Sequence, residues 1–133
     1  MSKGHEKHHE RHVGLSKFGK DLVRRSGSHC ELCNKHGVKL VVHEVPPSPP
    51  EPELEHCIFI CEGCDHQLRQ PKRTQPDYWH FLATSMWSTI PAVKISSLLM
   101  LHRLCETEPW AAELLDEVYL TPEEQAWLRA ARR

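Results

Sequence analysis

The sequence predicts a small α+β fold, in which a module with a short β-hairpin is followed by an α-helical bundle. Two C-x-x-C pairs, Cys30/Cys33 and Cys61/Cys64, bracket two short segments that are rich in β-branched and apolar residues. No glycine follows Gly63, and apolar residues recur there at the spacing of amphipathic helices. We therefore expect strands in the first half of the chain and helices in the second.

The two C-x-x-C pairs predict a zinc site. Structural zinc takes four thiolate or imidazole ligands at the corners of a tetrahedron, and one C-x-x-C turn supplies two thiolates. Gly27 before the first pair and Gly63 inside the second give the backbone of these turns freedom to fold back toward the sulfurs. The expected cofactor is Zn²⁺, and the expected ligands are Cys30, Cys33, Cys61 and Cys64. The module is then a zinc ribbon or treble clef that draws much of its stability from the metal.

A redox dithiol or a pair of disulfides is the alternative use of these cysteines. It requires an oxidising compartment or a thioredoxin-like βαβ pattern around one pair. Residues 1–11 are charged and rich in histidine, without the apolar stretch of a signal peptide, and no segment approaches transmembrane length. We therefore expect a cytoplasmic protein without membrane contact, in which Cys57 and Cys105 are ordinary small buried residues.

Three parts are expected along the chain. Residues 1–13 form a flexible tail, because few of their side chains are apolar, and the tail chelates a metal only if it becomes helical. Its histidines are His5, His8, His9 and His12. Residues 14–70 form the zinc-binding module, which begins with a helix between Ser16 as N-cap and Gly27. Residues 76–133 form a helical region packed on this module.

Two strands are expected in the module, at residues 39–45 and 57–61, because both segments are rich in β-branched and apolar side chains. Prolines recur through residues 46–52 between them. Proline cannot donate a hydrogen bond within a sheet, so this stretch predicts an extended loop.

Four helical segments are expected in the second half. They begin near Pro76, Thr89, Pro109 and Thr121. In the last segment Glu124 follows Thr121 at the spacing of a capping box. The tryptophans alternate with aliphatic residues rather than with Lys or Arg, so we expect them, Trp127 included, in a hydrophobic core and not in a base-stacking platform.

The formal net charge is −1, but the charges are unevenly distributed. Residues 1–40 carry nine Lys/Arg against four Asp/Glu, whereas residues 41–68 carry six Asp/Glu and no Lys/Arg. Basic side chains beside the two cysteine pairs form a candidate contact surface for nucleic-acid phosphates. They are Lys17, Lys20, Arg24, Arg25, Arg69, Lys72 and Arg73. Because the total charge is near zero, a protein partner fits equally well, and the oligomeric state stays open.

Several segments resemble the zinc-ribbon part of bacterial PhnA-type proteins. They are CELC at residues 30–33, VHEVPP at 42–47, SMWS at 85–88, IPAV at 90–93 and MLHRL at 100–104. The resemblance covers about residues 15–129 and implies zinc ligation by the four paired cysteines. The phosphonoacetate-hydrolase activity sometimes attached to this family is not implied, because no paired-metal carboxylate cluster or activated nucleophile is visible.

The chain also resembles, more weakly, the HNH-type treble-clef nucleases. In these nucleases a C-x-x-C pair is followed by a strand that ends in V-[DH]-H-[IV]-x-P and then by an apolar strand that leads into a second C-x-x-C pair, and this chain has the same order of elements. In that pattern the general-base histidine falls at Glu44, the positioning asparagine at His56, and the histidine after the fourth cysteine at Asp65. All three differ, which favours a treble clef kept as scaffold. The alternative is an altered hydrolytic site of Glu44, His43 and Asp65 in a metal-dependent phosphodiesterase.

Three histidines near the cysteine turns, His36, His43 and His56, are expected beside the zinc site or on the surface. Four cysteines already fill the tetrahedron, so the histidines are not needed as ligands. Together these patterns favour a non-catalytic, PhnA-like zinc-binding protein that contacts a protein or a nucleic acid.

Overall fold

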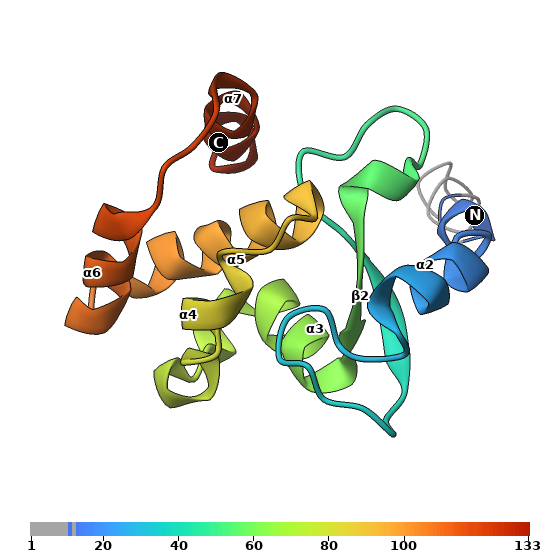
Figure 1. Ribbon diagram of the computed structural model, residues 1–133, viewed down its shortest axis with the longest axis horizontal. Coiled ribbons are helices and arrows are strands. Elements are labelled where there is room, and N and C mark those ends of the chain that lie inside the picture. The colour runs from blue at the N-terminus through green and yellow to red at the C-terminus, as the bar shows by residue number, and fades with distance from the viewer. Residues whose placement is uncertain (1–10, 12) are drawn as a thin grey trace.

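Figure 1 shows the computed structural model, which describes residues 11 and 13–133. The expected flexible tail at residues 1–13, with its four histidines, lies outside the described residues except for Arg11 and Val13. The described chain has the α+β fold that the sequence predicts, with a two-stranded antiparallel sheet and a series of helices after it. None of the helices in this part of the chain combines the length and the apolar character needed to cross a membrane.

The hairpin consists of β1 (Leu40–Glu44) and β2 (Cys57–Cys61), at the positions expected from the sequence. Leu40 pairs with Cys61 and Glu44 with Cys57. Because α2, α3 and α5 all contact β2, only Phe59 of this strand is not buried. The proline-rich loop between the strands ends in the short 3-10 helix η1 (Leu54–His56).

The helix α2 (Gly19–Ser26) leads into the first cysteine turn. It ends at Gly27, whose φ of 63° lies in the left-handed region, where glycine has no side chain to strain. The predicted N-cap at Ser16 is wrong. Its hydroxyl donates to the carbonyl of Val13 at 2.7 Å, and Phe18 precedes the helix without a side-chain cap.

The second half of the chain is helical, as predicted. Its elements are α3 (Glu62–Arg69), η2 (Pro71–Arg73), η3 (Pro76–Trp79), α4 (Leu82–Ser85), α5 (Pro91–Leu104), α6 (Pro109–Glu117) and α7 (Pro122–Ala131). The segment that begins at Pro76 is broken into a 3-10 turn and a short helix. The residue before α5 is Ile90 rather than the expected Thr89.

The capping box of α7 is formed as predicted. The Glu124 N–H donates to the Thr121 hydroxyl at 3.1 Å, and the Thr121 N–H donates to the Glu124 carboxylate at 2.9 Å. The backbone N–H groups of Thr121 and Glu124 are thereby satisfied. The Lys94 ammonium adds an ion pair to Glu124 at 3.1 Å, which links α7 to α5.

The central helix is α5, nine of whose residues are buried, so almost its whole surface faces other elements. It contacts α4, α6 and α7 among the helices, and β2 and η1 in the hairpin region. Figure 1 shows it running between α6 and the hairpin. The buried cluster around it, with Leu98 and Trp79, also includes Cys30, Cys61 and Cys64. One hydrophobic core therefore extends from the helices to the cysteine turns.

The tryptophans differ in burial more than the sequence predicts. Trp79 is fully buried, whereas Trp87 is 50% exposed, so the expected core position is wrong for Trp87. Trp127 is only partly buried. Its ring lies against His56, with the centroids 4.6 Å apart, and its Nε1–H donates to the Pro46 carbonyl at 2.9 Å. This side chain therefore docks α7 on the loop between the strands.

Candidate metal centre

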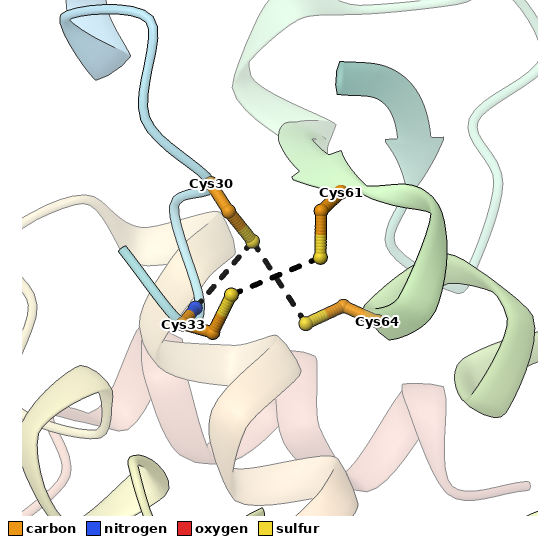
Figure 2. Close-up of side chains that lie close together, drawn as sticks. All are labelled: Cys30, Cys33, Cys61 and Cys64. Carbon is orange, nitrogen blue, oxygen red and sulfur yellow. Dashed lines mark hydrogen bonds between the residues drawn. The ribbon is translucent and has the colours of Figure 1, made fainter. Parts of the chain in front are cut away.

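The first cysteine turn is closed by backbone hydrogen bonds. The N–H of Cys30 donates to the carbonyl of Lys35, and the N–H of Asn34 donates to that of Cys30, both at 2.8 Å. Asn34 has a φ of 67°, which reverses the chain after the turn. The N–H of Cys33 points at the Cys30 sulfur, 3.4 Å away. Because the turn folds back on itself, both sulfurs face the same side, as Figure 2 shows.

The second cysteine turn lies where the hairpin meets α3. Cys61 is the last residue of β2 and Cys64 lies in the first turn of the helix. Gly63 between them is not among the glycines with a left-handed φ, so its role is not the backbone freedom that the sequence suggests. A strand end and a helix start thus present two more sulfurs to the first turn, the arrangement expected of a treble clef.

The four cysteine sulfurs lie within 4.8 Å of one another (Figure 2). The Sγ atoms of Cys30 and Cys64 are 3.8 Å apart, and those of Cys33 and Cys61 are 3.7 Å apart. A tetrahedral zinc ion with Zn–S bonds of about 2.3 Å has sulfur–sulfur edges of about 3.8 Å, so these separations fit one ion. They are far too long for disulfides, whose sulfurs are about 2.05 Å apart. The cluster is therefore a candidate metal centre, and ligation of zinc by it stays a prediction.

Burial and the hydrogen bonds between the cysteines give these thiols different pKa values. The hydrogen bond between Cys30 and Cys64 lowers the pKa of Cys30 to about 5 and raises the pKa of Cys64. Burial raises the pKa of Cys33 to about 11. Since thiolates this close repel one another, the cluster carries its full negative charge only around a cation. A divalent ion that takes four thiolates in a tetrahedron fits such a cluster, and zinc is one such ion.

Tyr78 reaches the cluster from the helical half of the chain. Its Oη lies 3.3 Å from the Cys64 sulfur and 3.7 Å from the Cys61 sulfur. Burial and then the hydrogen bond with Cys64 raise the pKa of Tyr78. No sequence pattern marks this residue as part of the site, because its contact with the cysteines depends on how η3 packs on α3 and not on any spacing.

The residues of the hydrolytic alternative are engaged in two separate contacts. Nδ1 of His43 lies 3.3 Å from Oδ1 of Asp65, which also forms an ion pair with Arg69 at 3.0 Å. Burial opposes ionisation of Asp65, but the hydrogen bonds from His43 and Arg69 outweigh it and lower its pKa. Glu44 is instead bound by the guanidinium of Arg11, with Nε 2.7 Å from Oε1.

No shared metal site therefore joins these three residues in the part of the chain that the structure describes. There, the four cysteines are the one group of three or more His, Cys, Asp or Glu side chains gathered at metal-binding distance. His36 lies against His29, with ring centroids 5.2 Å apart, and His56 lies against Trp127.

Six of the seven predicted basic contact residues form two exposed groups. Lys17, Lys20 and Arg24 belong to the α2 region, and Arg69, Lys72 and Arg73 lie at the end of α3 and beyond it. In Figure 1, α2 and α3 lie on either side of the hairpin, so the two groups are separated. Arg25 belongs to neither group, because its guanidinium donates to the Glu31 carboxylate and to the Cys57 carbonyl.

No protein-family model, curated protein or solved structure matches the chain. The function is therefore inferred from the cysteine cluster and the surfaces around it.

Proposed function

We propose that the chain is a non-catalytic zinc-binding protein, similar to PhnA-type zinc ribbons, that acts by contacting a macromolecule. The observation that carries this proposal is the closed cluster of four cysteines. Cys30, Cys61 and Cys64 are at most 4% exposed, and four thiolates leave no coordination position for a substrate. A zinc ion at this place joins the two cysteine turns, the hairpin and α3, which is a structural role.

A nucleic acid is the partner that the exposed basic groups support. Lys17, Lys20 and Arg24 project from one side of the hairpin region, where they can contact phosphates regardless of base sequence. On duplex DNA each such contact adds about −0.9 to the slope of log affinity against log salt. A protein partner is the alternative, which the near-neutral net charge of −1 leaves open.

An HNH-like phosphodiesterase is the second candidate function. The contact between His43 and Asp65 favours it, because a carboxylate beside an imidazole can orient the ring for proton transfer or for metal binding. The pairing of Glu44 with Arg11 counts against it, because the guanidinium occupies the carboxylate that would act as the general base.

The test uses the zinc-loaded protein with labelled duplex DNA and single-stranded RNA, plus magnesium, at low and physiological salt. On a native gel we expect the protein to shift the labelled nucleic acid to slower migration. The shift should weaken as the salt concentration rises, and the nucleic acid should not be cleaved. The variant Lys17→Glu/Lys20→Glu/Arg24→Glu should abolish the shift. The matched control Arg129→Glu/Arg132→Glu/Arg133→Glu makes the same change of net charge at the end of α7 and should retain it.

Other outcomes reject parts of the proposal separately. A protein that purifies folded without zinc contradicts the metal assignment. A zinc-loaded protein that shifts neither DNA nor RNA at low salt contradicts nucleic-acid binding and leaves the protein partner. Cleavage that is lost in Glu44→Gln, with zinc still bound, would replace the proposal with the phosphodiesterase.

A further inference from the structure

The hydroxyl of Tyr78 lies against two of the four sulfurs, at 3.3 Å from Cys64 and 3.7 Å from Cys61. Within residues 11 and 13–133, no other non-cysteine side chain forms a hydrogen bond with a sulfur of this cluster. A zinc-bound thiolate carries no hydrogen, so between phenol and sulfur the phenol is the donor. We infer that Tyr78 donates a hydrogen bond to the Cys64 thiolate and thereby slows release of the metal. This inference rests on the proposed zinc binding.

The position of Tyr78 is set by contacts of its neighbours on η3. Trp79 is fully buried, and its Nε1–H donates to the side-chain oxygen of Gln67 at 2.7 Å. The backbone N–H of Gln75, just before η3, donates to the same oxygen at 2.8 Å. Gln67 belongs to α3, the helix that begins at the second cysteine turn. The segment that carries the phenol is therefore fastened to the same helix as Cys64.

The ring of Tyr78 is also held by packing. It lies edge-on to Trp79 and to Phe81, with ring centroids 5.3 Å and 5.6 Å away. Edge-to-face pairs of this kind restrict a ring to one orientation. The hydroxyl is thus directed at the sulfurs before a metal binds, so the hydrogen bond costs little additional ordering.

The absence of a side chain at Gly63 makes room for the Tyr78 hydroxyl. A Cβ atom at this position would lie 2.8 Å from the Tyr78 Oη, closer than real Cβ contacts allow. Since the backbone of Gly63 does not have a left-handed φ, conformation alone does not require glycine there. The missing side chain leaves the space that the phenol occupies. The second cysteine turn and Tyr78 are therefore complementary in shape as well as in hydrogen bonding.

The hydrogen bond has a definite chemical consequence. Four thiolates around one divalent ion leave an excess of negative charge, which makes each sulfur prone to protonation and dissociation. A donor that shares this charge stabilises the bound thiolate, and loss of such a partner typically costs about 10–100-fold in metal affinity. We expect the effect to appear mainly in the rate at which zinc leaves.

The experiment compares Tyr78→Phe with Tyr119→Phe, since the chain has two tyrosines and Tyr119 is 91% exposed. Both variants and the unmodified protein are first assayed for bound zinc. Transfer of zinc to an excess of a coloured chelator should be about tenfold faster from Tyr78→Phe, as expected for loss of a partner to a metal ligand. Tyr119→Phe should release zinc at the unmodified rate.

A spectroscopic measurement separates the hydrogen bond from a general loss of packing. In the cobalt-loaded proteins, loss of the donor raises the energy of the sulfur lone pairs, so the sulfur-to-cobalt charge-transfer band should move to longer wavelength in Tyr78→Phe only. Gly63→Ala, which pushes the hydroxyl away, should give the same shift. In the Tyr78→Phe background Gly63→Ala should add little, because the two changes remove one interaction.

The outcomes distinguish this inference from the proposed function. An unmodified protein that binds no zinc rejects the proposed metal site and the inference with it. If all proteins bind zinc but Tyr78→Phe matches Tyr119→Phe in release rate and in the cobalt band, the role of Tyr78 is rejected and the zinc site stands. If Tyr78→Phe fails to fold, an unchanged band in Gly63→Ala overturns the inference.

Discussion

Arg25 and Glu31 are joined by two parallel hydrogen bonds, from Nε to Oε2 at 2.9 Å and from Nη2 to Oε1 at 2.7 Å. The Glu31 carboxylate also accepts the N–H of Phe59 at 2.8 Å, and Arg25 donates to the Cys57 carbonyl at 2.7 Å. The Glu31 side chain is only 4% exposed. This pair ties α2, the first cysteine turn and the free edge of β2 together.

Glu31→Ala should destabilise the zinc-loaded protein by about 2 kcal/mol, because it leaves the partly buried guanidinium of Arg25 and the N–H of Phe59 without their acceptor. Urea unfolding measures the change. Arg24→Met, at an exposed position of the same helix, is the control and should stay within about 0.5 kcal/mol of the unmodified protein. Equal losses from the two variants would contradict the structural role of the pair.

Elements with a local pattern were predictable from the sequence. The β-branched run before the proline-rich loop and the apolar run after it predicted the two strands. The spacing of Thr121 and Glu124 predicted the capping box of α7. The C-x-x-C pairs predicted which sulfurs would meet. In each case the residues that decide the structure are neighbours in sequence, or belong to a motif with fixed ligand geometry.

Features that depend on tertiary packing were not predictable. Arg24 and Arg25 are adjacent and chemically identical, but only Arg25 faces Glu31. The packing of α2 therefore decides which of the two is exposed and which forms an ion pair. Tyr78 is one aromatic residue in an apolar segment, and only the attachment of η3 to Gln67 brings it to the cysteines. Sequence spacing carries no signal for either contact.

Substitution of one clustered cysteine should release the metal. Cys61→Ser is expected to reduce bound zinc from one ion to almost none and to unfold the first half of the chain, since a three-cysteine remnant binds zinc weakly and the module depends on the metal. Metal analysis and circular dichroism measure the two effects. Cys57→Ala and His43→Ala are the controls, because neither side chain belongs to the cluster, and both should retain zinc. Equal zinc loss in His43→Ala would overturn the all-cysteine assignment.

Zinc binding should release at least two protons at pH 7. Burial raises the pKa of Cys33 to about 11, and the hydrogen bond with Cys30 raises that of Cys64, so both are protonated thiols before the metal binds. The metal-bound state holds fewer protons, so the affinity for zinc increases as pH rises. Release of two protons makes this increase about 100-fold per pH unit. Below about pH 5 Cys30 must also lose a proton, and the dependence steepens.

Calorimetry in two buffers of different ionisation enthalpy counts these protons directly. The Cys57→Ala variant, whose changed thiol lies outside the cluster, should release the same number as the unmodified protein. A count below two would mean that the cluster is already ionised without metal, contrary to the raised pKa values of Cys33 and Cys64.

Trp127 and Pro46 are 81 positions apart, and the hydrogen bond between them fastens α7 to the loop between the strands. Trp127→Phe removes the Nε1–H but keeps an aromatic ring against His56, so it should cost about 1 kcal/mol, the contribution of one hydrogen bond. Urea unfolding measures this loss, and limited proteolysis should cleave α7 faster. Trp87→Phe, at a half-exposed position, is the matched control and should change neither. If both variants resist protease like the unmodified protein, α7 is held by its apolar contacts with α5, and the bond to Pro46 is dispensable.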